Sequence, residues 1–299
     1  MTPPAQRAPK FPLRLDQLAS VPKTLTPLAD DASPPVASSA HRSRSPTASK
    51  QPARTLLRPQ RPLQQAHADA SRLHAPSGMG LDSADVRQRM VRRLRAGGLR
   101  NPNVLNAMQA VPRHLFVDAA LVTQAYEDTS LPIGHGQTIS KPSVVAHMIE
   151  LLHGGANARA TSALGSVLEI GTGCGYQAAV LAMLARQVIS VERLKPLHDK
   201  ARALLAPLRS GNLRLVYGDG MLGHAPNAPY DSIIAAAGGD SLPQAWLEQL
   251  ALGGRLVSPV RQPGLHRQVL VVVDRTERGF EHSIYEAVNF VPLKSGLVG

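Results

Sequence analysis

Three glycines at alternate positions follow an acidic residue near the end of an apolar run. The run covers residues 167–170 and includes Glu169, and Gly171, Gly173 and Gly175 come directly after it. Glycine adopts positive φ without strain and lets the backbone approach a ligand with no Cβ in the way. A helical pattern follows, so the segment predicts a strand, a ligand-binding loop and a helix in that order.

The spacing of the glycines distinguishes between two kinds of cofactor. A dinucleotide-binding fingerprint, GxGxxG, would place its third glycine at position 176, which is Tyr176 here. The observed ExGxGxG is the methyltransferase form of the loop and indicates S-adenosylmethionine as the cofactor. A glycine-rich turn alone is often only a turn, so this interpretation depends on two further acidic residues.

Glu192 and Asp219 each follow another apolar run. Glu192 closes the run at 188–191 and lies 21 residues after the first glycine, where an acid can accept hydrogen bonds from both ribose hydroxyls. Asp219 precedes Gly220 and follows the run at 213–217, where it can accept from the exocyclic amine of adenine. An acid after a strand is also a common helix cap, but three acids after three successive strands favour one adenosine-containing cofactor.

The elements that must position these residues alternate between strands and helices. Strands are predicted near 167–170, 188–192, 213–217, 231–236 and 255–260, and helices near 176–185, 194–206 and 243–250. This alternation predicts a parallel, doubly wound α/β sheet. The β runs at 268–274 and 284–291 are too close for a helical crossover and predict an antiparallel pair at the end of the sheet. Such a sheet is the usual shape of class I methyltransferases.

The part before the core is expected to be mainly helical. Helices are predicted from Asp82 to the glycine pair at 97–98, over 103–110 and over about 143–152, with a loop-rich region from 111 to 142. We therefore assign a methyltransferase domain to residues 81–299, with a helical part at 82–152 and a cofactor-binding core at 165–299.

The first 80 residues differ in composition from the rest of the chain. They hold 13 of the 25 prolines and a single aromatic residue, and they carry 11 Lys and Arg against 4 Asp and Glu, within a net charge of +12 for the whole chain. Such a segment buries too little apolar surface to offset its ordering entropy. It predicts a disordered basic tail, which can contact nucleic acid non-specifically or serve only as a solvated spacer.

The remaining composition points to a reducing compartment. Cys174 is the only cysteine, which excludes an internal disulfide and a cysteine-based metal cluster, and no metal site is expected. The chain has no signal-peptide pattern and no run of roughly 20 apolar residues for a membrane span. A cytoplasmic protein is expected, and the absence of a sustained heptad favours a monomer.

Residues 82–299 closely resemble the bacterial protein-L-isoaspartate O-methyltransferases. The resemblance rests on VPRHLFV at 111–117, LPIGHGQTISKP at 131–142, VLEIGTGCGYQAAVLA at 167–182, SVER at 190–193, GDG at 218–220, YDSII at 230–234, GGRLVSPV at 253–260 and FVPL at 290–293. The GQTIS element discriminates, because ExGxGxG is shared by methyltransferases of every substrate class.

The resemblance implies transfer of a methyl group from S-adenosylmethionine to the α-carboxyl of L-isoaspartyl residues in damaged proteins and peptides. It implies that Ser140 is catalytic and that Gly134 to Thr138 line the same site. The cofactor-binding residues assigned are Gln137, Thr138, Glu169, Gly171, Gly173, Gly175, Glu192, Asp219 and Gly220. By position alone, Ser140 before Lys-Pro is a helix N-cap. Two departures from the family are Gly238-Gly239, where prolines are common, and Lys294, to which we assign no role.

Three other functions are compatible with parts of the pattern. The same machinery can methylate another carboxylate, on a small molecule or a peptide natural product. A nucleic-acid methyltransferase is suggested by the positive charge, but residues 235–239 lack the Asn/Asp-Pro-Pro-aromatic sequence that orients a base amine. A binding module without activity would be expected to lose the glycines, Glu192 or Ser140, and none is lost.

Overall fold

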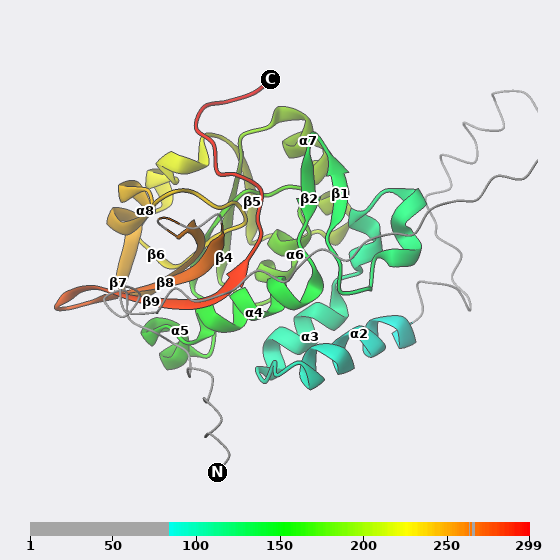
Figure 1. Ribbon diagram of the computed structural model, residues 1–299, viewed down its shortest axis with the longest axis horizontal. Coiled ribbons are helices and arrows are strands. Elements are labelled where there is room, and N and C mark those ends of the chain that lie inside the picture. Colours follow the sequence, from blue (N-terminus) through cyan, green and yellow to red (C-terminus); the bar gives the residue numbers. More distant parts are fainter. Residues whose placement is uncertain (1–83, 263, 265–266) are drawn as a thin grey trace, which may run out of the picture. The chain divides into compact units, whose positions relative to one another are not determined.

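The computed structural model describes residues 84–262, 264 and 267–299, which belong to one structural unit (Figure 1). The disordered tail predicted over 1–80 lies outside the described residues, and so does the predicted helix start at Asp82. No helix in the described part of the chain combines the length and apolarity needed to cross a membrane.

A seven-stranded sheet of order β5-β4-β3-β6-β7-β8-β9 lies at the centre (Figure 1). Its strands are β3 (Ser166–Ile170), β4 (Gln187–Glu192), β5 (Leu213–Tyr217), β6 (Tyr230–Ala235), β7 (Leu250–Arg261), β8 (Gln268–Thr276) and β9 (Gly279–Val288). Strands β3 to β7 are parallel, and β8 is antiparallel to both of its neighbours. The predicted doubly wound sheet and its antiparallel pair are confirmed. Every residue of β3 is buried, as expected for a strand covered on both faces.

Helices cover both faces of the sheet. They are α2 (Ala84–Ala96), α3 (Pro102–Ala110), α4 (Pro142–His153), α5 (Ala156–Thr161), α6 (Tyr176–Ala182), α7 (Lys195–Leu205) and α8 (Gln244–Gln249). Helices α2 to α7 pack in one apolar core with alternate strand residues such as Val167 and Val188. The other core takes Leu168 and Ile189 together with Trp246 of α8. The period-2 alternation of the strands therefore fills two separate cores.

Local sequence sets the ends of the first two helices. Helix α2 stops at the predicted glycine pair, where Gly98 takes a φ of +105° and the amide of Leu99 donates to the carbonyl of Leu94. Helix α3 starts with Pro102, and the Asn101 side chain accepts from the next two free amides.

Some elements differ from the sequence prediction. Helix α5 was missed because six residues are too few to show a helical period. Strand β7 begins at Leu250 rather than 255, and β9 begins at Gly279 rather than 284. The first four residues of β9 are exposed, so its pairing with β8 depends on backbone hydrogen bonds and leaves no apolar pattern.

The region predicted as loop-rich contains a hairpin that reaches the site. Strands β1 (Leu131–Gly134) and β2 (Gln137–Ile139) are antiparallel. The turn passes through Gly134, His135 and Gly136, all at positive φ. The buried side chains of Leu131, Ile133 and Ile139 fix one face of the hairpin in the core. Residues 135–138 of the hairpin line the cavity described next, together with Ile133 and Ile139.

Candidate functional site

A cavity of about 390 Å³ lies at the carboxyl ends of the central parallel strands. The loop after β3 forms its floor, with Gly171 at a φ of +89° and Gly173 at +57°. A Cβ at Gly171 would lie 3.6 Å from the Cβ of Ala236, and one at Gly173 would lie 3.2 Å from Cδ1 of Ile133. The glycines therefore keep open a space that side chains would narrow.

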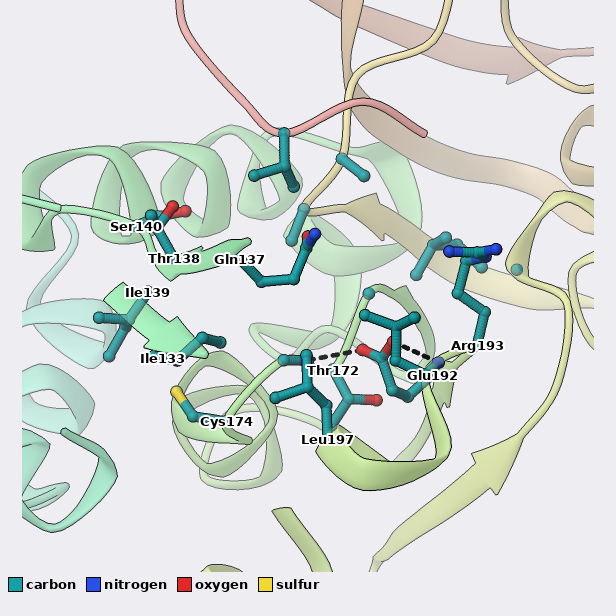
Figure 2. Close-up of a pocket in the computed structure, with 18 of the residues that line it drawn as sticks. Ile133, Gln137, Thr138, Ile139, Ser140, Thr172, Cys174, Glu192, Arg193 and Leu197 are labelled. Atoms are coloured by element: carbon teal, nitrogen blue, oxygen red, sulfur yellow. Dashed lines mark hydrogen bonds between the residues drawn. The ribbon is translucent and has the colours of Figure 1, made fainter. Parts of the chain in front are cut away.

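Glu192 fixes this loop from the end of β4. Its Oε2 accepts from the amide of Gly173 at 2.9 Å, and its Oε1 accepts from the amide of Leu194 at 2.9 Å. Figure 2 shows both bonds, with Glu192 and Thr172 on one side of the cavity and Thr138 with Ser140 on the other. Each carboxylate oxygen has a further lone pair, so the group can still accept from the hydroxyls of a bound ribose.

Ser140 is held by a buried arginine. Arg113 is fully buried, and it donates from Nε to the carbonyl of Ala125 and from Nη2 to the carbonyl of Ser140 at 2.7 Å. Its guanidinium lies 4.8 Å from the ring centroid of Tyr176. Burial lowers the pKa of Arg113, but a guanidinium remains charged in proteins. The main chain at Ser140 therefore has a fixed position.

The interpretation of Ser140 as a helix N-cap is wrong. Lys141 is the N-cap residue of α4, and no side chain of the helix start caps it. Asp128 supplies the missing acceptor from a distant loop, because it accepts from both the amide and the hydroxyl of Ser143 at 2.8 Å. Within the described residues the Ser140 hydroxyl has no hydrogen-bond partner, so it is available to a ligand.

Glu169 lies behind the glycine loop and not in the cavity. Its side chain is fully buried, and the Ser190 hydroxyl donates to its Oε2 at 2.5 Å. Ser190 also hydrogen-bonds the hydroxyl of Thr172 at 2.6 Å, and Thr172 lines the cavity. Burial raises the pKa of Glu169 to about 8, and the hydrogen bond from Ser190 only partly offsets this effect. The carboxyl group is therefore protonated near neutral pH. It stabilises the glycine loop through the hydrogen bonds that connect it, by way of Ser190, to Thr172.

We expect Glu169→Gln to change how stability depends on pH. The ordinary pKa is 4.5 and the folded value is about 8, so the folded protein binds the extra proton between these values. Its contribution to the free energy of unfolding is complete below the lower value and falls as the pH rises through the higher one. Melting temperatures from about pH 5 to about pH 9 should therefore decline less in Glu169→Gln than in the wild type.

The exposed residue Glu248 supplies a matched control for this experiment. Glu248→Gln should follow the wild-type pH profile. Parallel profiles for wild type and Glu169→Gln would contradict the assigned protonation state.

The cavity brings together most of the residues assigned from the sequence. Its lining includes Ser140, Gln137, Thr138, Gly171, Gly173, Glu192 and Gly220. Gly175, at a φ of +93°, is instead the N-cap residue of α6, where a Cβ would lie 2.8 Å from Cδ1 of Leu205. Asp219 also lies outside the lining, and its two oxygens accept from the amides of Met221 and Gly296.

Several lining residues were not anticipated from the sequence. They are Thr172, Gln177, Arg193, Leu197 and the segment 291–294, which includes Lys294. Thr172 could have been inferred from its place between two loop glycines. The motif FVPL at 290–293 contributes to the family resemblance, but it does not indicate that the segment lines the cavity, because the segment reaches the cavity only after the whole sheet has formed. Cys174 also lines the cavity, and burial raises the pKa of its thiol to about 11, which makes it unreactive.

The cavity fits the cofactor that the loop indicates. Its volume lies in the range of cofactor pockets, and the glycine loop leaves a cradle that a Cβ would narrow. Glu192 can take the ribose hydroxyls, while Ile133 and Leu197 offer apolar surface. The sheet and this site together define a class I S-adenosylmethionine-dependent methyltransferase.

Comparisons with known proteins identify the family. The model of the protein-L-isoaspartate(D-aspartate) O-methyltransferase family matches residues 85–297. A protein-L-isoaspartate O-methyltransferase of Methylibium petroleiphilum is 59% identical over 97% of both chains. Another, of Burkholderia vietnamiensis, is 50% identical over 98% of this chain and 99% of its own. The chain belongs to the protein-L-isoaspartate O-methyltransferase family.

Solved structures agree with this assignment. A protein-L-isoaspartate O-methyltransferase aligns with a TM-score of 0.63 and 26% identity, over 71% of this chain and 67% of its own. A protein from Plasmodium falciparum, solved in complex with S-adenosyl-L-homocysteine, has the same fold, with a TM-score of 0.59 and 22% identity over 70% of this chain and 98% of its own.

Proposed function

We propose that this repair methyltransferase uses Ser140 to orient the α-carboxylate of an L-isoaspartyl residue for methylation by S-adenosylmethionine. The observation that carries the proposal is the meeting of two cavities. A groove of about 650 Å³ shares Thr138, Ser140, Ala236 and Val291 with the cofactor cavity. A side chain lying in the groove can therefore reach the cofactor cavity beside the free Ser140 hydroxyl.

The shape of the groove suits a peptide in extended conformation. One wall is formed by residues 286–291 at the end of β9, and the other by the start of α4, including Lys141 and His147. Strand β9 is the last strand of the sheet, and among the described residues it pairs only with β8. Its outer edge presents backbone groups that can hydrogen-bond a peptide whatever its side chains. Such recognition suits an enzyme that must accept many damaged proteins.

The reaction needs positioning more than proton transfer. The cofactor supplies an electrophilic methyl group. A carboxylate, with an ordinary pKa near 4, is already ionised at neutral pH, so no general base is required. Ser140 donates a hydrogen bond to one carboxylate oxygen and leaves the other free for attack, while Arg113 keeps the main chain of Ser140 in place.

Ser140→Ala tests this assignment on a matched pair of peptides that differ only in an L-isoaspartyl or L-aspartyl linkage. With labelled S-adenosylmethionine, the wild type should methylate only the isoaspartyl peptide. Loss of one hydrogen bond to a charged group should lower kcat/KM about tenfold to hundredfold. Binding of S-adenosylhomocysteine should change little.

Ser210→Ala is the matched control, because Ser210 lies outside both cavities. Equal kcat/KM for Ser140→Ala and Ser210→Ala would refute the role of Ser140. Labelling of neither peptide by a wild type that binds the cofactor would redirect the search to other carboxylates and to nucleic acid.

The protein is further proposed to act as a cytoplasmic monomer, as its composition suggests. Light scattering coupled to gel filtration would settle the oligomeric state. Contact between nucleic acid and the basic tail concerns residues outside the described part of the chain, and it would appear as salt-dependent retention of the full-length protein on RNA.

A further inference from the structure

The chain crosses the cofactor cavity after its last strand. We call residues 291–298 the C-terminal strap; in Figure 1 they belong to the red segment that leads to the C-terminus. The first part of the strap exchanges backbone hydrogen bonds with Gly238 in the loop after β6. At its other end, Val298 donates to the carbonyl of Arg193 and accepts from the amide of Lys195. The strap thus joins the loops that follow two different strands.

The strap forms part of the cavity wall. Val291, Pro292, Leu293 and Lys294 all line the cavity, opposite the glycine loop. A ligand bound in the cavity is therefore covered by the strap on one side. The strap is the part of the wall nearest to the end of the chain.

Two side chains of opposite charge hold the strap at the same place. Arg193 donates from Nε to the carbonyl of Gly296 at 2.9 Å and from Nη2 to the carbonyl of Ser295 at 3.3 Å. Asp219 accepts from the amide of Gly296 at 2.6 Å. Hydrogen bonds that involve a charged group are the stronger ones. Gly296 has a φ of +78°, which explains glycine at this point.

The strap is held by hydrogen bonds more than by packing. Leu297 and Val298 are its last large apolar side chains, and they are 55% and 42% exposed. Releasing residues 295–298 therefore exposes little additional apolar surface. Segments with few buried apolar contacts open at a low free-energy cost without global unfolding.

We propose that the C-terminal strap is a latch on the cofactor cavity, that Arg193 and Asp219 are the positioning residues that close it, and that the cofactor exchanges when the strap opens. The inference rests on the cofactor assignment and does not depend on the isoaspartyl substrate. The sequence analysis assigned the carboxylate of Asp219 to the exocyclic amine of adenine. The proposed latch gives this carboxylate a second role, which is to hold the amide of Gly296.

The test measures the dissociation rate of labelled S-adenosylmethionine, chased with excess S-adenosylhomocysteine and without any methyl acceptor. Failure of the proposed substrate specificity therefore cannot affect the result. Arg193→Ala, and separately deletion of residues 295–299, should each accelerate dissociation about tenfold. Arg193→Lys keeps one donor and should fall between Arg193→Ala and the wild type. Melting temperatures should stay close to that of the wild type.

A variant that combines Arg193→Ala with deletion of residues 295–299 distinguishes a latch from a direct contact between Arg193 and the cofactor. If Arg193 acts only through the strap, Arg193→Ala should not accelerate dissociation beyond the effect of the deletion.

Gly296→Ala provides a second strap variant that retains every hydrogen-bonding group and strains only the turn. Arg186→Ala is the control, because that side chain is 77% exposed and lies outside the cavity. Unchanged dissociation in the single variants, or additive effects in the double variant, would overturn the proposal.

Discussion

Arg113→Ala is expected to lower the free energy of unfolding by about 3–5 kcal/mol, the range for removing a large, hydrogen-bonded buried side chain. The change leaves the carbonyls of Ala125 and Ser140 without their donor and creates a cavity beside Tyr176. Burying an unsatisfied carbonyl adds to the cost of lost packing. Urea unfolding of the two proteins, compared at equal m-values, measures the difference.

Two further variants separate stability from positioning. Arg261→Ala removes an exposed arginine whose ion pair with Asp240 is also exposed, and its effect should stay below about 1 kcal/mol. Arg113→Lys retains the charge but cannot donate to both carbonyls with the same geometry. It should lower kcat toward the isoaspartyl peptide while leaving the affinity for S-adenosylhomocysteine nearly unchanged. A wild-type kcat in Arg113→Lys would show that the arginine does not position Ser140.

Glu192→Ala should weaken binding of S-adenosylhomocysteine about hundredfold, or by about 3 kcal/mol. The carboxylate holds the amides of Gly173 and Leu194, so its removal frees the loop that forms the cavity floor. It also removes the acceptor assigned to the ribose. Titration calorimetry measures the change directly.

Glu192→Gln refines the experiment because the amide has one acceptor oxygen where the carboxylate has two. It should retain one of the two backbone bonds and give an intermediate affinity. Glu248→Ala, at an exposed position on α8, should bind like the wild type. Wild-type affinity in Glu192→Ala would remove this residue from the site.

What the sequence could predict depends on how local the signal is. The glycine loop, the acid at position 192 and the parallel sheet come from short patterns, and in the structure the glycine loop follows β3 and Glu192 ends the neighbouring parallel strand β4. The class of enzyme could be inferred from spacing alone, whereas the substrate needed the resemblance carried by residues 136–140. Strands β1 and β2 were missed because they are only four and three residues long, and the turn between them contains glycines.

Other features depend on residues that are far apart in the chain. Arg113 reaches the carbonyl of Ser140 across 27 positions, and Asp219 reaches Gly296 across 77. Neither pairing leaves a periodic pattern that a reader of the sequence could detect. Asp128, which replaces Ser140 as the capping group of α4, is hidden for the same reason.

The second apolar core has a practical consequence for spectroscopy. Trp246 is the only tryptophan of the chain and is fully buried in that core. Its indole Nε1 donates to the carbonyl of Gly220 at 2.8 Å, and Gly220 lines the cofactor cavity. The indole is shielded from water, and its hydrogen bond to Gly220 connects it to the cavity wall. Its fluorescence is therefore expected to change when a ligand binds in the cavity. The molecule thus carries its own fluorophore next to the cofactor cavity, so that cavity can be monitored without a label.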